Sequence, residues 1–173
     1  MRKVILASQS PRRRQLLQEI LPTFFVMTDD AEEVIAPGIP PEQAVQELAL
    51  QKASHVASRC DIDALVIGAD TAVVLDNEIL GKPENAKRAK EMLRMLSGRT
   101  HVVYTGIVVL DNRTGRMVQA VERTQVLFRT LVEEEMDAYV ATGEPMDKAG
   151  AYGIQEKGAL FVEGIQGDFF NVV

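Results

Sequence analysis

LASQSPRRRQLL, residues 6–17, joins a strand directly to a helix. Residues 4–7 are apolar and predict a short strand that ends at Ser8. Ser10 is a favourable N-cap residue and Pro11 suits the first helical position, so we expect the helix to begin at once. Its apolar face is expected at Leu16, Leu17, Ile20 and Leu21.

Three arginines, Arg12, Arg13 and Arg14, fall in the first turn of this helix. The helix dipole is positive there, so each cation costs roughly a few tenths of a kcal/mol. Free backbone N–H groups, the dipole and the guanidinium groups all favour an anion, and phosphate fits guanidinium best. Two interpretations stay open, a solvated basic turn or a phosphate site.

The composition predicts one domain, with room for two lobes. A chain of 173 residues that are 46% hydrophobic can bury one core but is too short for two ordinary domains. Its 19 basic and 25 acidic residues argue against an extended surface for nucleic acid or for an anionic membrane. The arginine cluster therefore suits a small ligand better.

The cysteine, histidine and hydropathy patterns argue against a disulfide, a zinc site and a membrane-spanning segment. The single Cys60 rules out an internal disulfide. His55 and His101 are too few and too far apart for a zinc signature, so both are expected at the surface or at a sheet edge. The apolar start is too short for a signal peptide and no apolar run could span a bilayer, so we expect a soluble, cytoplasmic protein without membrane binding.

Two early segments carry candidate polar groups. Residues 28–33, TDDAEE, are either a solvated acidic turn or, beside a phosphate, a source of carboxylates for a divalent metal. A helix is predicted for residues 41–57, and Lys52 lies on its apolar face between Leu48 and Val56. Lys52 either covers apolar surface with its ammonium in water, or reaches into a polar cavity.

Residues 65–75, LVIGADTAVVL, form the clearest strand of the sequence. A run that is apolar on both faces is typical of a strand covered on both sides, as in an α/β sheet. Asp70 lies at its centre, where an unpaired carboxylate would be costly and needs a cation, hydrogen bonds or a proton. Such carboxylates concentrate in functional sites, and a paired structural aspartate is the alternative.

A second candidate lysine, Lys82, lies between Gly81 and Pro83, which fix where its side chain leaves the backbone. The alternative is a surface lysine in a turn. Residues 84–96 then predict a helix with core residues at helical spacing, and residues 97–98 end it.

The second half of the chain contains a hairpin and a glycine-rich loop. Residues 142–155 are polar and glycine-rich, which is typical of a loop that contacts a ligand, although a plain connection is the alternative. The regular elements are expected as an antiparallel hairpin of strands at 100–110 and 117–128, a helix at 132–141, and a returning pair of strands at 159–162 and 168–173.

Five short motifs follow one another through nearly the whole chain. They are LASQSPRR at residues 6–13, GADT at 68–71, GKP at 81–83, LSG at 96–98 and GEPMDKAGAY at 143–152. In this order and at this spacing they resemble the Maf family of nucleoside triphosphate pyrophosphatases. Residues 1–173 are therefore expected to form a single Maf-like domain.

The resemblance implies an α/β fold similar to the inosine triphosphatase type, with a central twisted mixed sheet flanked by helices and two lobes with a cleft. It implies hydrolysis of nucleoside triphosphates to the monophosphate and pyrophosphate with a divalent cation, usually Mg²⁺, with Mn²⁺ as an alternative. The resemblance also implies a homodimer, since family members are often dimeric. The implied cellular roles are removal of non-standard nucleotides and arrest of cell division through septum formation.

The resemblance also implies roles for individual residues. Asp70 matches the proton acceptor, and Glu33 and Asp70 are candidates for metal contacts. Arg12, Arg13, Lys52 and Lys82 would line the triphosphate side. The full set expected to bind substrate is Ser8, Arg12, Arg13, Lys52, Thr71, Lys82, Asp147, Lys148 and Gln155.

Three positions separate the branches of the family. Arg12, Thr71 and Gln155 resemble the branch that acts on dTTP and UTP, whereas the branch for 7-methyl-GTP carries tryptophan, glutamine and glutamate there. The expected substrates are dTTP and UTP, with dUTP as a further candidate. The alternatives are a pyrophosphatase for 7-methyl-GTP or another modified nucleotide, and a nucleotide-binding regulator of septum formation without turnover.

Two features depart from the family pattern. Family members usually continue after NVV, here residues 171–173, with GLP and a last helix, so that C-terminal helix is expected to be absent. Glu156 and Lys157 follow Gln155 where a glycine is common, which could alter the loop near the base.

Overall fold

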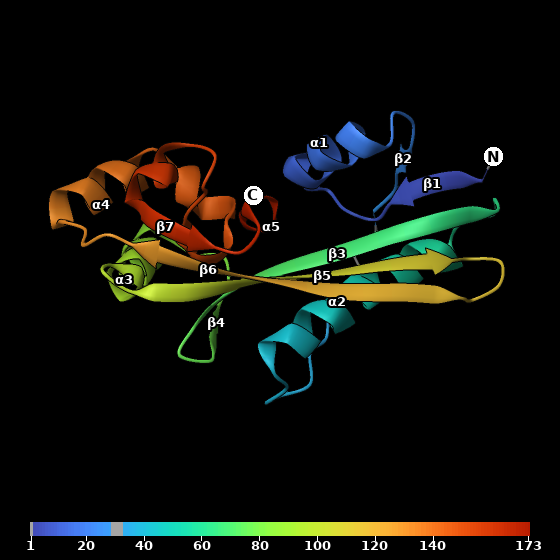
Figure 1. The fold of residues 1–173 in the computed structure, drawn as a ribbon, viewed down its shortest axis with the longest axis horizontal. Coiled ribbons are helices and arrows are strands. Elements are labelled where there is room, and N and C mark those ends of the chain that lie inside the picture. The colour runs from blue at the N-terminus through green and yellow to red at the C-terminus, as the bar shows by residue number, and fades with distance from the viewer. Residues whose placement is uncertain (1, 29–32) are drawn as a thin grey trace. The chain divides into compact units, whose positions relative to one another are not determined.

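The protein has a mixed α/β fold in the computed structural model, which describes residues 2–28 and 33–173 (Figure 1). The strands are β1 (Lys3–Leu6), β2 (Phe25–Val26), β3 (Ala64–Leu75), β4 (Glu78–Leu80), β5 (Thr100–Asp111), β6 (Met117–Phe128) and β7 (Val162–Gln166). The helices are α1 (Pro11–Ile20), α2 (Pro41–Ser58), α3 (Ala86–Leu96), α4 (Glu133–Ala141) and α5 (Phe169–Val172). Three short 3-10 helices complete the set, η1 (Glu144–Asp147), η2 (Ala149–Ala151) and η3 (Lys157–Phe161).

Within the described ranges the strands form one seven-stranded sheet in the order β2-β1-β3-β5-β6-β7, and β4 pairs with β3 outside this path. β2 and β3 run parallel to β1, whereas β4 and β7 run antiparallel to their partners. A turn of five residues joins β5 to its neighbour β6, which only an antiparallel pair allows. The expected mixed sheet and its long hairpin are confirmed.

The chain forms two compact units. Unit 1 comprises Met1–Asp70 and Thr105–Val121, and unit 2 comprises Thr71–Tyr104 and Glu122–Val173, so β3, β5 and β6 contribute residues to both. Each unit has its own apolar core. The core of unit 1 contains Ile5, Ala7, Ala49, Ala53, Val56, Ala64, Val66 and Val108. The core of unit 2 is larger and includes Val73, Leu80, Leu93, Leu96, Val103, Val126, Phe128, Met136, Tyr139, Tyr152 and Phe161.

Two glycines let α2 pack closely against the strands of unit 1. A Cβ atom on Gly68 of β3 would lie 2.1 Å from the carbonyl oxygen of Ala49, and one on Gly106 of β5 would lie 2.5 Å from that of Val45. Any larger residue would therefore push the helix backbone away from the sheet. This close approach brings Lys52 of α2 to β3.

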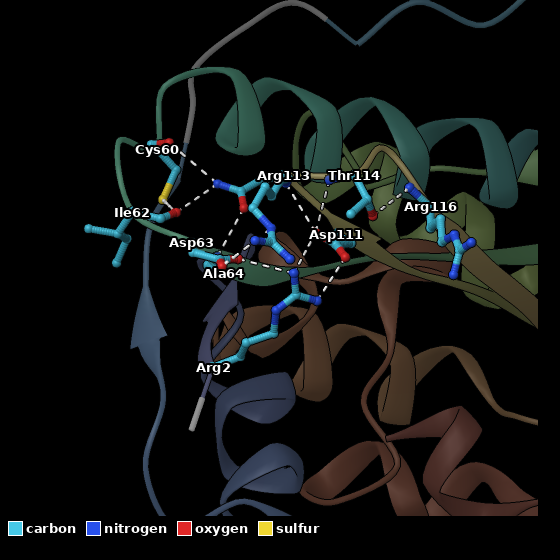
Figure 2. Close-up of polar contacts among 10 residues, drawn as sticks. Arg2, Cys60, Ile62, Asp63, Ala64, Asp111, Arg113, Thr114 and Arg116 are labelled. Carbon is cyan, nitrogen blue, oxygen red and sulfur yellow. Dashed lines mark hydrogen bonds and ion pairs between the residues drawn. The ribbon is translucent and has the colours of Figure 1, made fainter.

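A polar network fixes the turn between β5 and β6 within unit 1 (Figure 2). Arg2 donates hydrogen bonds of 2.7 and 3.2 Å to the carboxylate of Asp111 and forms a 3.2 Å ion pair with Asp63. Asp111 also accepts from the backbone N–H groups of Arg113 and Thr114 in the turn. These contacts, led by the hydrogen bond from Arg2, hold the pKa of Asp111 well below its usual range.

Two expectations about burial are wrong. The side chain of Ile20 in α1 is 77% exposed, and Leu17 is the buried residue of that helix, so its apolar face is narrower than expected. His101 is 1% exposed and lies on β5, between β3 and β6, instead of at the surface or at a sheet edge. It lies on the inward face of β5 because alternate residues of a strand share a face and Val103 is buried too.

The end of the chain is a strand followed by a short helix, not the expected pair of strands. β7 begins at Val162, and the following helix α5 begins after Asp168, whose side chain accepts from the N–H of Asn171. Asn171 in turn donates to the carbonyl of Val103 and to the hydroxyl of Thr124. Helix capping and these buried amide bonds favour the helix over a further strand. No helix in the described ranges is both long and apolar enough to cross a membrane.

Candidate active site

The first turn of α1 holds an arginine against the middle of strand β3. Ser10 caps the helix, accepting from the N–H of Arg13, as the sequence predicts. The guanidinium of Arg13 donates to the carbonyl of Ala69 in β3 at 2.8 Å and to the hydroxyl of the buried Ser8 at 3.3 Å. Ser8 and Arg13 are therefore brought together beside Asp70, whereas Arg12 is half-buried in the same helical turn.

Lys52 and Asp70 form the central ion pair of unit 1. The ammonium of Lys52 donates to Oδ1 of Asp70, and the same nitrogen lies 3.1 Å from Oε1 of Glu33. The side chain of Asp70 is 15% exposed and that of Lys52 is 23% exposed, so the pair is largely removed from water. Of the two interpretations of Lys52, this geometry supports a lysine that reaches a polar site.

Burial raises the pKa of Asp70 above its ordinary value. The positive charges of Lys52 and Arg13 act in the opposite direction, and the negative charge of Glu33 adds to the rise. Desolvation outweighs the attraction because the carboxylate has lost most of its contact with water. A carboxylate with a raised pKa accepts a proton more readily, which suits a general base.

Glu33 and Asp70 are the two metal candidates from the sequence, and both approach the same ammonium of Lys52. Two carboxylates together with phosphate oxygens of a substrate make the set of hard oxygen ligands that Mg²⁺ prefers, so these residues fit such an ion. Among the residues that the structure describes, no group of three histidine, cysteine or acidic side chains could hold a metal. The other acids of the expected metal loop, at positions 29, 30 and 32, lie outside the described residues.

Unit 2 contains the glycine-rich loop, residues 142–155. Lys148 of this loop donates its hydrogen bonds to other residues of the same loop. The side chain of Lys148 is 8% exposed, and its ammonium donates at 2.8 Å both to the carbonyl of Glu144 and to the carboxylate of Asp147. The backbone turns sharply next to it, with positive φ at Gly150 and at the fully buried Ala151. A non-glycine residue in this conformation costs roughly 1–2 kcal/mol, and functional loops often carry such strain.

The remaining predicted residues of unit 2 lie nearer to solvent. Thr71, which follows Asp70 in β3, is half-buried, and Gln155 is exposed. Lys82 is exposed as well, and it lines an open hollow of about 420 Å³ together with Lys87, Arg88, Glu84 and Glu91. Three cations against two carboxylates leave this hollow with a positive charge that suits phosphate.

Two residues that the sequence did not single out, Tyr139 of α4 and Glu144 of the glycine-rich loop, are hydrogen-bonded to each other. The hydroxyl of Tyr139 donates to the carboxylate of Glu144 at 2.8 Å, and that carboxylate accepts from the backbone N–H groups of Lys157 and Gly158. Glu144 belongs to the GEPMDKAGAY motif, but the sequence does not indicate which backbone N–H groups a side chain will bind. The pairing therefore could not have been found from residue types alone.

Known proteins are similar in sequence to this chain over its full length. A dTTP/UTP pyrophosphatase of Bacillus cereus is 51% identical over 173 residues, which covers 100% of this chain and 89% of the relative. A dTTP/UTP pyrophosphatase of Bacillus anthracis is 52% identical with the same coverage.

Solved structures share the fold at low sequence identity. A HAM1 protein from Coxiella burnetii has a TM-score of 0.52 at 18% identity, covering 93% of this chain and 92% of its own. A nucleoside-triphosphatase, or dITP/XTP pyrophosphatase, from Mycobacterium abscessus has a TM-score of 0.51 at 18% identity, covering 82% and 94%.

The family model described as Maf-like protein matches residues 3–173, nearly the entire chain. The relatives, the sheet and the five motifs agree with it. The chain therefore belongs to the Maf-like protein family.

Proposed function

We propose that the protein hydrolyses dTTP and UTP, with dUTP as a further candidate, to the monophosphate and pyrophosphate. One observation carries the proposal, the 51–52% identity over the full chain to proteins named dTTP/UTP pyrophosphatases. Asp70, buried beside two cations, supplies the kind of base that such a hydrolysis needs. Arg12, Thr71 and Gln155 are the residues to which we assign the choice of base.

In the proposed reaction a water molecule attacks the α-phosphorus of the nucleotide, and the carboxylate of Asp70 accepts the proton of that water. Arg13 and Lys52, already aligned beside Asp70, offset negative charge on the phosphates. Lys82 and Arg12 would bind the rest of the substrate, Asp147 and Lys148 would contribute through the loop that their hydrogen bond holds together, and Ser8 holds Arg13 in place. Fixed positive charge near phosphate oxygens is the main means by which enzymes catalyse phosphoryl transfer.

A divalent cation, Mg²⁺ or alternatively Mn²⁺, would be held by Glu33 and Asp70 together with substrate phosphates. When bound, such an ion neutralises charge on the pyrophosphate leaving group. The chain supplies the two carboxylates, and the single ammonium of Lys52 contacts both of them. A homodimer and a cytoplasmic location stay predictions.

The substrate is tested by pyrophosphate release from the purified protein with Mg²⁺ against dTTP, UTP, CTP, 7-methyl-GTP and the common purine triphosphates. We expect dTTP and UTP to be hydrolysed fastest. A preference for 7-methyl-GTP would contradict the substrate but keep the reaction. Turnover of no nucleotide, in folded protein, would favour a binding regulator.

The position of attack is tested in water labelled with ¹⁸O. Attack at the α-phosphorus places one labelled oxygen in UMP and none in pyrophosphate. Label in the pyrophosphate would place the attack on the β-phosphorus and contradict the proposed step.

A further inference from the structure

The carboxylate of Glu144 binds the backbone at one end of a loop segment in unit 2. Its Oε1 accepts from the N–H of Gly158 at 3.2 Å, and its Oε2 accepts from the N–H of Lys157 at 3.3 Å. Both oxygens of one carboxylate thus hold two successive amides that lie 13 and 14 residues further along the chain. Hydrogen bonds to an ionised acceptor are stronger than neutral ones, so this contact fixes the backbone firmly.

Tyr139 binds the other end of the same segment. Its hydroxyl accepts from the N–H of Gly153 at 3.3 Å and donates to Oε1 of Glu144 at 2.8 Å. The ring is buried and packs edge-on against Phe161, with 4.9 Å between the ring centroids. Burial and the bond to Glu144 raise the pKa of Tyr139 far above its usual value, so the phenol keeps the proton that it donates.

The backbone of Glu144 is itself held in place. The buried ammonium of Lys148 donates to its carbonyl at 2.8 Å, and its N–H donates to the hydroxyl of Thr142 at 3.1 Å. The carboxylate therefore extends from a fixed point. Residues 153–158 are clamped at both ends by Glu144 and Tyr139.

Gln155 lies in the middle of this clamped segment, and its side chain is exposed while the preceding Ile154 is buried. A carboxamide has one acceptor and one donor group, so it can match the edge of uracil or thymine, which offers a carbonyl and an N–H. The same amide, turned over, would match other bases. Discrimination therefore requires that the backbone carrying Gln155 be held in one position.

We propose that Glu144, with Tyr139, is a positioning residue that sets base selectivity by clamping the segment that carries Gln155. This inference rests on the proposed hydrolysis of dTTP and UTP. Glu144 acts through the backbone of residues 153–158 and does not itself contact the nucleotide.

The test compares Glu144→Ala, the milder Glu144→Gln and Tyr139→Phe with a matched control, Glu134→Ala, which removes an exposed carboxylate from α4. We expect the ratio of kcat/KM for UTP to that for GTP to fall about tenfold in Glu144→Ala, the effect of about one lost positioning hydrogen bond. Glu144→Gln keeps one acceptor oxygen and should restore part of the ratio. Tyr139→Phe keeps the packed ring and should lower the ratio less, and the control should leave it unchanged.

A purely stabilising role is separated by a double mutant and by amide exchange. In a Gln155→Ala background, Glu144→Ala should change the ratio no further, because the two residues act as one unit. Amide hydrogens of residues 153–158 should exchange faster in Glu144→Ala and Tyr139→Phe than in the control. An unchanged ratio in Glu144→Ala, equal loss for all nucleotides, or unchanged exchange would overturn the proposal.

The experiment also separates this proposal from the proposed function. If the wild-type protein hydrolyses no nucleotide, the proposed function fails, and with it the assigned selectivity. If the wild type prefers UTP and only the variants fail to alter that preference, the proposed function stands and the role of Glu144 is contradicted.

Discussion

Lys52 donates a hydrogen bond from its ammonium to the carboxylate of Asp70, 18 residues away in sequence. One partner comes from α2 and the other from the centre of β3, and the close packing at Gly68 allows them to meet. Burial raises the pKa of Asp70, and the neighbouring ammonium of Lys52 lowers it. With Asp70 as the proposed base, we expect these two opposing effects to shape the pH dependence of turnover.

Replacing Lys52 by methionine should move the acid limb of the pH profile to higher pH. A base acts only when deprotonated, so kcat/KM falls as the pH drops through the pKa of Asp70. The charge of Lys52 lowers that pKa, and its removal leaves burial and Glu33 to raise it further. Rates of pyrophosphate release from UTP between pH 5 and 9 measure the shift. An acid limb that stays in place in Lys52→Met would show that another group is titrating.

Replacing Lys82 by alanine should chiefly weaken binding of the triphosphate. The exposed ammonium lies in the positive hollow of unit 2, where it can bind the β- and γ-phosphates. Loss of charge-assisted hydrogen bonds of about 1.5–3 kcal/mol predicts a KM for UTP that is roughly 10- to 100-fold higher, with little change for UMP binding. Steady-state rates of pyrophosphate release measure the KM for UTP, and calorimetric titration measures the affinity for UMP. Equal affinity of the wild type for UTP and UMP would argue against the assigned role.

Removing the divalent cation should abolish turnover, and Glu33 should determine how much cation is needed. EDTA is expected to stop pyrophosphate release and added Mg²⁺ to restore it. Glu33→Gln keeps the size of the side chain but loses one of two carboxylates, so about tenfold more Mg²⁺ should be required, equivalent to about 1.4 kcal/mol. Glu19→Gln, on the exposed face of α1, is the matched control. The same Mg²⁺ requirement in both variants would remove Glu33 from the metal site.

The buried His101 should make stability depend on pH. Burial lowers its pKa to about 4 from the ordinary value of 6.5, so between these values the unfolded state binds a proton that the folded state does not. Stability therefore falls as the pH drops through this window, by about 3 kcal/mol in all. Urea unfolding at pH values from 4 to 7 should give a shallower dependence for His101→Gln than for the wild type.

A matched control for this prediction is His55→Gln, which removes the half-buried histidine of α2. Its stability should follow the wild-type dependence on pH. His101 also accepts or donates one hydrogen bond with the hydroxyl of Tyr152 at 2.8 Å, so His101→Gln lowers stability at every pH. Only the slope tests the titration, and equal slopes in His101→Gln and the wild type would refute it.

Local chemistry made much of the fold predictable from the sequence. Ser10 and Pro11 start α1 as expected, because capping depends on residues within one turn. The sequence places Asp70 in an apolar strand and Lys52 on the apolar face of a helix, and both positions are unusual for a charged residue. Their pairing was not predictable, because it depends on how α2 packs on β3, which no local pattern encodes.

The errors have equally specific causes. His101 alternates with the buried Val103 along β5, and that period of two could have placed it inside the protein. Asp168 is a favourable N-cap residue, and it would have indicated α5 had the apolar residues after it not suggested a strand. Glu144 binds backbone amides, which carry no sequence signal.

The most direct measurement is the turnover of UTP by Asp70→Asn beside Asp61→Asn, an exposed aspartate of unit 1. Asparagine keeps an oxygen that can accept from Lys52 but cannot accept a proton from water. We predict that pyrophosphate release falls about 10²- to 10⁴-fold in Asp70→Asn, that UTP still binds, and that Asp61→Asn behaves like the wild type. Unchanged turnover in a folded Asp70→Asn protein would contradict the assignment of Asp70 as the base.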